Sequence, residues 1–89
     1  MDLEVVVEGV SDVRVEHAIK RTIQQLCVTA ARPGEWSVLV CPSETRGHWD
    51  LGVRGPFGRR FVSFAERTGP LPDQIAEHLN ASRVWESRE

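Results

Sequence analysis

Three consecutive segments in the middle of the chain alternate apolar side chains with polar or small ones: residues 36–42, 47–54 and 59–66. Alternation with a period of two is typical of β-strands that bury one face and expose the other. Glycine and proline mark the turns, above all at residues 55–58, which read Gly-Pro-Phe-Gly. Strands joined by such short turns pair antiparallel. The sequence therefore predicts an antiparallel three-stranded meander, to which the remaining segments must be fitted.

The registers of the two hairpins are tested by the side chains that they bring together. A first turn at residues 43–46 makes Val40 face Trp49, and the glycine-proline turn makes Arg54 face Arg59. A slip of one residue in either hairpin would divide the apolar residues between the two faces. With these registers one side of the sheet carries the whole predicted core set: Trp36, Val38, Val40, Trp49, Leu51, Val53, Val62 and Phe64.

The segment before the meander predicts a strand followed by a helix. Residues 3–8 are rich in valine, and Glu4, Val6 and Glu8 share the face opposite the other apolar residues. A serine and an aspartate can cap the start of the predicted helix, residues 12–31, and the Pro-Gly pair after it stops it. The helix carries an apolar stripe at helical spacing, formed by Ile19, Ile23, Leu26 and Ala30.

The last segment, residues 71–84, predicts a second helix. A proline stands near its first position, where the missing N–H costs nothing, and Asp73 suits the positive helix end. The last seven residues are largely charged apart from Val84 and Trp85, so we expect this tail to fray. The short apolar stripe of the helix consists of Leu71, Ile75 and Leu79, with Ala76.

The segments follow the order strand, helix, three strands, helix. A strand–helix–strand crossover is right-handed in about 98% of structures, which places the first strand parallel beside the second. We predict an α+β fold, a two-layer sandwich of order β-α-β-β-β-α. Its four-stranded mixed sheet has both helices on one face and leaves the other face open. The 89 residues form a single domain at residues 1–85, with a frayed charged tail at residues 86–89.

Composition and charge exclude several classes of protein. Hydrophobic residues make up 40% and charged residues 27%, as in globular domains rather than disordered or coiled-coil chains. The net charge of −2 does not favour bulk attraction to nucleic acid or to an anionic membrane. Apolar runs fall short of the about 20 residues of a membrane helix, and the first residues lack a secretory pattern, so we expect a cytoplasmic protein. Cys27 and Cys41 show no Cys-x-x-Cys spacing, so we expect two reduced thiols and no cofactor.

The predicted open face carries one cluster of interest for binding. Arg54 faces Arg59 across the second turn, Arg60 follows, and Phe61 lies opposite Gly52. Like charges directly opposite are mildly destabilising, and an anion would relieve them. An aromatic ring flanked by arginines also occurs on single-stranded nucleic-acid platforms, although such arginines equally serve as solvated edge residues. The same face presents apolar side chains suited to a protein partner or a second copy: Val6, Leu39, Cys41 and Phe61.

No catalytic constellation emerges from the residue pattern. His48 and Asp50 lie two apart on one strand face, but no nucleophile with an oriented base accompanies them, and a metal there would lack a further ligand. The serines stand in no Gly-x-Ser-x-Gly context, and the glycine-rich turn lacks the following helix of a phosphate loop. We therefore predict no enzymatic activity and no metal site, and His48 joins the arginine cluster as a binding residue only.

A valine-rich strand ending in a glycine, residues 5–9, precedes a helix with apolar residues at Val15, Ile19, Ile23 and Leu26. This pattern and the order of the elements resemble the double-stranded-RNA-binding fold, in the variant found in ribosome hibernation factors. The resemblance implies the double-stranded-RNA-binding fold, and it implies that the protein binds RNA or the ribosome. Double-stranded-RNA binders place a lysine cluster at the start of the last helix, where residues 67–73 of this chain hold one arginine and no lysine. The resemblance therefore extends to the topology and not to the phosphate-binding residues.

Two hypotheses of function follow. The first is a small non-enzymatic interaction module that docks through its open sheet face to a protein partner or, as a homodimer, to a second copy of itself. The alternative, which is not favoured, is a weak RNA- or ribosome-associated module that uses Arg54, Arg59, Arg60 and Phe61. Salt distinguishes the two, because phosphate contacts weaken steeply as salt rises and an apolar interface does not. Neither hypothesis involves a cofactor or a membrane.

Overall fold

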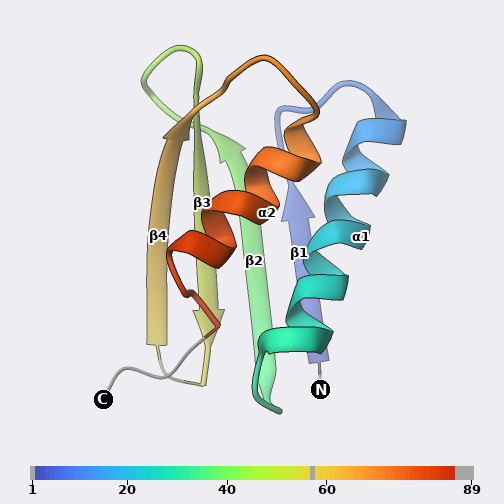
Figure 1. Ribbon diagram of the computed structural model, residues 1–89, viewed down its shortest axis with the longest axis vertical. Helices are drawn as coiled ribbons and strands as arrows, with labels where there is room; N and C mark the ends of the chain where they lie inside the picture. Colours follow the sequence, from blue (N-terminus) through green and yellow to red (C-terminus); the bar gives the residue numbers. More distant parts are fainter. Residues whose placement is uncertain (1, 57, 86–89) are drawn as a thin grey trace.

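The computed structural model describes residues 2–56 and 58–85, which form six elements: β1 (Asp2–Val7), α1 (Val13–Ala30), β2 (Glu35–Pro42), β3 (His48–Gly55), β4 (Gly58–Ala65) and α2 (Leu71–Ala81). The strands form one sheet in the order β1-β2-β3-β4, and both helices lie on the same face of it (Figure 1). β1 runs parallel to β2, while β2, β3 and β4 form an antiparallel meander. The predicted α+β fold is thereby confirmed. The tail predicted at residues 86–89 lies outside the described residues.

α1 extends over the segment that the apolar stripe predicts. The Asp12 carboxylate caps it, with Oδ1 accepting a hydrogen bond from the Arg14 backbone N–H at 2.9 Å. Ala30 was expected in the buried stripe and is instead exposed at the last helical position, where the helix leaves the sheet. The fully buried face of α1 consists of Ile19, Ile23 and Cys27.

The second hairpin has the predicted register, whereas the register predicted for the first hairpin is wrong. Pro42, and not Val40, lies opposite Trp49, so the pairing is displaced by two residues. The turn has the predicted length but lies one residue later in the chain, at residues 44–47, because the Ser43 N–H donates to the His48 carbonyl at 3.0 Å. A displacement of two residues keeps every side chain on its own face, so alternation alone could not distinguish the two registers.

The apolar face predicted for the sheet forms the core. Trp49 and Val62 are partly buried and pack against its edge. α2 adds Ile75 and Leu79, and its His78 ring stacks on Phe64 with the ring centroids 4.5 Å apart. The buried members of the predicted set are Trp36, Val38, Val40, Leu51, Val53 and Phe64.

The prediction that the chain frays from Arg83 onward is wrong for Val84 and Trp85, which are each only 2% exposed. α2 ends at Ala81, and Arg83 adopts a left-handed conformation with φ of 51° that turns the chain back. The Arg60 guanidinium donates a hydrogen bond to the Arg83 carbonyl and holds this turn on the sheet. Trp85 then packs edge-on against Trp36, with ring centroids 5.4 Å apart.

Replacing Trp85 by alanine is expected to lower the free energy of unfolding by about 3–5 kcal/mol, as for other buried aromatic side chains. The matched control is Val28→Ala, because Val28 is 74% exposed on α1. Its effect is expected to stay within about 0.5 kcal/mol. Urea unfolding followed by far-ultraviolet circular dichroism measures both variants. Equal stabilities would contradict the burial of Trp85.

A second prediction concerns two glycines of β3. A Cβ atom added at Gly55 would lie 2.4 Å from the Trp36 ring, whereas one added at Gly52 would lie 3.4 Å from the exposed Phe61 ring. Gly55→Ala is therefore expected to cost about 1–3 kcal/mol of unfolding free energy through overpacking. Gly52→Ala is expected to change it by about 0.5 kcal/mol or less, since the Phe61 ring can move aside. Gly55→Ala is therefore expected to melt at a lower temperature than Gly52→Ala. Equal or reversed melting temperatures would contradict the close packing of Trp36 on Gly55.

Candidate functional site

The candidate site is the face of the sheet that the helices leave uncovered, here called the open face. Side chains alternate between the two faces along each strand, and the strand pairing arranges those of the open face in rows across the sheet. Three such rows, from one end of the strands to the other, are a charged row, an apolar row and a polar row. The rows together form a continuous surface over all four strands.

The apolar row crosses the middle of the open face, where Val6, Leu39, Gly52 and Phe61 are consecutive partners. Val6 and Leu39 are each 38% exposed and Phe61 is 78% exposed, so large apolar side chains meet solvent here. The Phe61 ring leans over Gly52, which has no side chain to hold it away. This confirms the predicted pairing of Phe61 with Gly52. An apolar stripe across a whole sheet is typical of a surface that binds another protein.

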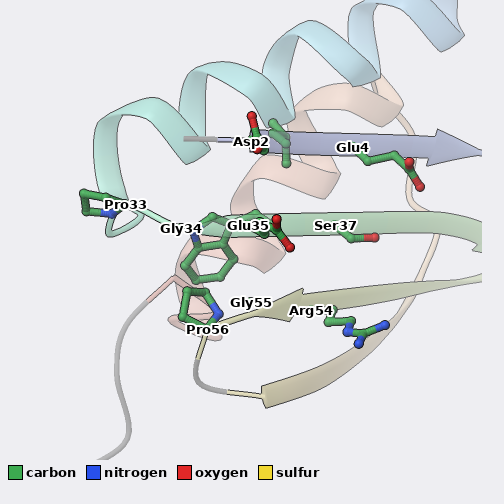
Figure 2. Close-up of a pocket in the computed structure, with 11 residues that line it drawn as sticks. Asp2, Glu4, Pro33, Gly34, Glu35, Ser37, Arg54, Gly55 and Pro56 are labelled. Carbon is green, nitrogen blue, oxygen red and sulfur yellow. The ribbon is translucent and has the colours of Figure 1, made fainter.

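The charged row lies beside the apolar row and consists of Glu4, Ser37, Arg54 and Arg59 as consecutive partners. Beyond it Asp2 pairs with Glu35, which adds further carboxylates on the β1 and β2 side (Figure 2). The two arginines face each other on β3 and β4, as predicted. At this end of the open face, negative charge therefore lies on the β1 and β2 half and positive charge on the β3 and β4 half.

A shallow depression lies at this end of the open face, where β1, β2 and β3 meet the loops that follow α1 and β3 (Figure 2). Carboxylates of Asp2, Glu4 and Glu35 line one side of it, and Arg54 and Pro56 line the other. Within residues 2–56 and 58–85, however, no group of three or more histidine, cysteine or acidic side chains is arranged to hold a metal ion. The depression is thus the end of the open face beside the charged row.

The polar row lies on the other side of the apolar row, where Cys41 pairs with Asp50 and Asp50 with Ser63. The Ser63 hydroxyl donates a hydrogen bond to Asp50 Oδ1 at 2.6 Å. Burial raises the pKa of the Cys41 thiol, and the carboxylates of Asp50 and Glu8 raise it further. Cys41 therefore carries less thiolate at neutral pH than an exposed cysteine and is a weaker nucleophile.

The structure brings together only part of the predicted binding cluster. Arg54, Arg59 and Phe61 share the open face, but Arg60 lies on the opposite face, where it donates to the carbonyl at the end of the chain's last turn. His48 lies at the far end of β3, and its Nδ1 is 3.2 Å from the Arg46 carbonyl oxygen. Alternation along β4 already separates Arg60 from its neighbours, so the sequence contained this signal.

The acidic half of the open face was not recognised from the sequence. Glu4 was placed on the same strand face as Val6, but no register was available for β1, so its neighbours were unknown. The parallel pairing supplies that register and sets Glu4 in line with the two arginines. An acidic half beside a basic half makes this surface different from a basic phosphate-binding platform.

Models of protein families and curated proteins were both compared with this chain, and neither comparison gives a match. The resemblance to ribosome hibernation factors therefore stays a hypothesis. In the described part of the chain no helix is long and apolar enough to cross a membrane.

The environment of Cys41 predicts how its alkylation depends on pH. Because its pKa is raised, the rate of reaction with iodoacetamide should rise at higher pH than for an unstructured thiol. Asp50→Asn should move this profile to lower pH, and Glu8→Gln should move it less, since Asp50 has the larger effect. Mass spectrometry of the labelled peptides separates Cys41 from Cys27, which is fully buried and serves as the internal control. A profile that Asp50→Asn leaves unchanged would contradict the proposed cause.

Proposed function

We propose that the protein is a non-enzymatic interaction module that docks to a protein surface through the open face of its sheet. The observation that carries this proposal is the apolar row, in which the exposed Phe61 and the partly exposed Val6 and Leu39 form one stripe across four strands. An isolated exposed apolar residue needs no explanation, but a continuous stripe is the usual mark of a protein interface.

Covering the apolar row with a partner would contribute favourably to the free energy of binding. Removing a phenylalanine side chain from water contributes about 1.5–3 kcal/mol. Aromatic residues are also enriched among the residues that dominate binding energy when they are enclosed by a partner. Phe61 is therefore the expected anchor, with Leu39 and Val6 extending the contact across the sheet.

The surrounding charges favour a protein over RNA. Two arginines, Arg54 and Arg59, flank Phe61 on the open face, but Asp2, Glu4 and Glu35 line the same end of it. Carboxylates repel phosphates, whereas a protein partner can match both signs of charge. The alternative, a weak RNA- or ribosome-associated module, is left with Arg54, Arg59 and Phe61, since Arg60 faces the helices.

The proposal is tested by placing a photoreactive phenylalanine analogue at position 61. The matched control carries the same analogue in place of Val28, which is nearly as exposed as Phe61 but lies on α1, away from the open face. After irradiation in the cells that produce the protein, position 61 is expected to form adducts with protein and position 28 is not. Mass spectrometry identifies the protein in the adduct.

The identified protein must also bind in purified form. Leu39→Asp should weaken that binding by about tenfold or more, since a carboxylate would enter an apolar contact, and raised salt should leave the wild-type affinity nearly unchanged. Adducts with RNA at position 61, together with binding that falls steeply with salt, would favour the alternative. Equal adducts at positions 61 and 28, or none at either, would overturn the proposal.

A further inference from the structure

We infer that the open face binds a second copy of the same chain, with β1 of one copy lying over β4 of its partner. This inference rests on the proposed function and names the occupant of the face. It is argued from the strand registers, independently of exposure: at the charged end of the open face, the acidic and basic positions exchange places under a half-turn. The complementarity follows from the row positions that the strand pairing defines.

The two copies are related by a half-turn about an axis that runs parallel to the strands, between the two facing sheets and midway between β2 and β3. This rotation reverses the order of the strands across the sheet, and each row keeps its position along the strand direction. β1 of one copy then lies over β4 of its partner, and β2 lies over β3. Sheets pack face to face about 10 Å apart with strand directions within about 30° of each other. Residues of the same row therefore meet across the interface, and each contact occurs twice because the interface is isologous.

In this arrangement the charged row pairs opposite charges. Glu4 lies opposite the partner's Arg59, and Ser37 lies opposite the partner's Arg54. Within one chain Glu4 and Arg59 are separated by three strand spacings, about 14 Å, so they do not neutralise each other directly. In the dimer, Glu4 and Arg59 each gain an oppositely charged neighbour from the second copy. The partner's Glu4 also reduces the repulsion between Arg54 and Arg59.

The apolar row is complementary in size. Val6 lies opposite the partner's Phe61, and Leu39 lies opposite the partner's Gly52. The largest side chain thus meets a smaller one, Val6, while Leu39 meets the bare Gly52 backbone together with the Phe61 ring that leans over it. Alternation of large and small residues across facing positions is what allows two layers to interdigitate.

The second copy can be related to the first by an axis parallel to the strands or by an axis across them, and charge distinguishes between the two. An axis across the strands would place β1 over the partner's β1, with Glu4 opposite the partner's Glu8 and Phe61 opposite the partner's Phe61. It would also place Arg54 opposite the partner's Asp50, an attraction that offsets part of the repulsion between Glu4 and Glu8. The axis parallel to the strands pairs Glu4 with the partner's Arg59 and brings no like charges together, so it is the geometry that we infer.

The size of the face sets the expected affinity. Strands of six to eight residues, spaced by about 4.8 Å, make a face of about 19 by 23 Å. Its area of about 440 Å² is roughly half of the about 800 Å² that a standard interface buries on each partner, so the interface belongs to the weak, transient class. A dissociation constant in the micromolar range is therefore expected, and self-association is to be sought from about 10 µM to about 1 mM.

The decisive experiment uses Glu4→Arg and Arg59→Glu, separately and mixed, with sedimentation equilibrium of the purified full chain. Alone, each variant places like charges opposite one another twice, so its self-association should be weaker than wild type by about tenfold. In an equimolar mixture the arginine introduced at position 4 meets the glutamate introduced at position 59. The native Glu4 of the second variant likewise meets the native Arg59 of the first, so a mixed dimer of near wild-type affinity should form.

The matched control is Arg21→Glu, the same charge change as Arg59→Glu but on the outward side of α1, and it should leave self-association unchanged. Circular dichroism confirms that the variants are folded before their masses are compared. A mixture that associates no better than the separate variants would overturn the inferred geometry. Stronger association of Glu4→Arg alone would overturn it in favour of the axis across the strands, where the introduced arginine would meet the partner's Glu8.

A wild-type monomer throughout the concentration range would overturn self-docking. Adducts of position 61 with a different protein would then still support the proposed function, so the two failures are distinguishable.

Discussion

The contacts of Trp36 connect parts of the chain that are distant in sequence. Its indole Nε1 donates to the Arg32 carbonyl at 2.8 Å, which ties the end of α1 to the start of β2. Its ring fills the space that Gly55 leaves open at the end of β3 and meets the edge of Trp85 from the last turn. The Trp36 side chain thus contacts the end of α1, the end of β3 and Trp85, and it holds these three parts together at one end of the core.

The placement of this core on one side of the sheet explains why the other side is available for binding. Two helices and the last turn are enough to bury the apolar face of four strands, and residues 2–56 and 58–85 hold no further element to cover the opposite face (Figure 1). An open antiparallel face normally presents polar residues to water. Here the apolar row interrupts that rule, and this exposed apolar row is the feature on which the proposed docking rests.

The distribution of charge on the open face depends on topology. At the charged end of this face, the acidic residues belong to the first strand and the start of the second, whereas the arginines flank the turn of the second hairpin. The parallel crossover puts β1 at the opposite edge of the sheet from β4, so the two kinds of charge come to lie on opposite halves. A half-turn about the strand direction exchanges those halves, which is why the surface matches a copy of itself.

Apolar alternation along the strands and the stripe of α1 determined the element order, the fold class and most of the core, because burial on one face leaves a periodic trace in the sequence. Tertiary structure alone decided three features. The first hairpin differs from prediction by two residues, since such a shift changes no face. Val84 and Trp85 are buried because the turn at Arg83, held by a distant arginine, directs them inward. The match of acidic and basic halves exists only once β1 pairs with β2, because charge complementarity depends on distances between strands that no local pattern encodes.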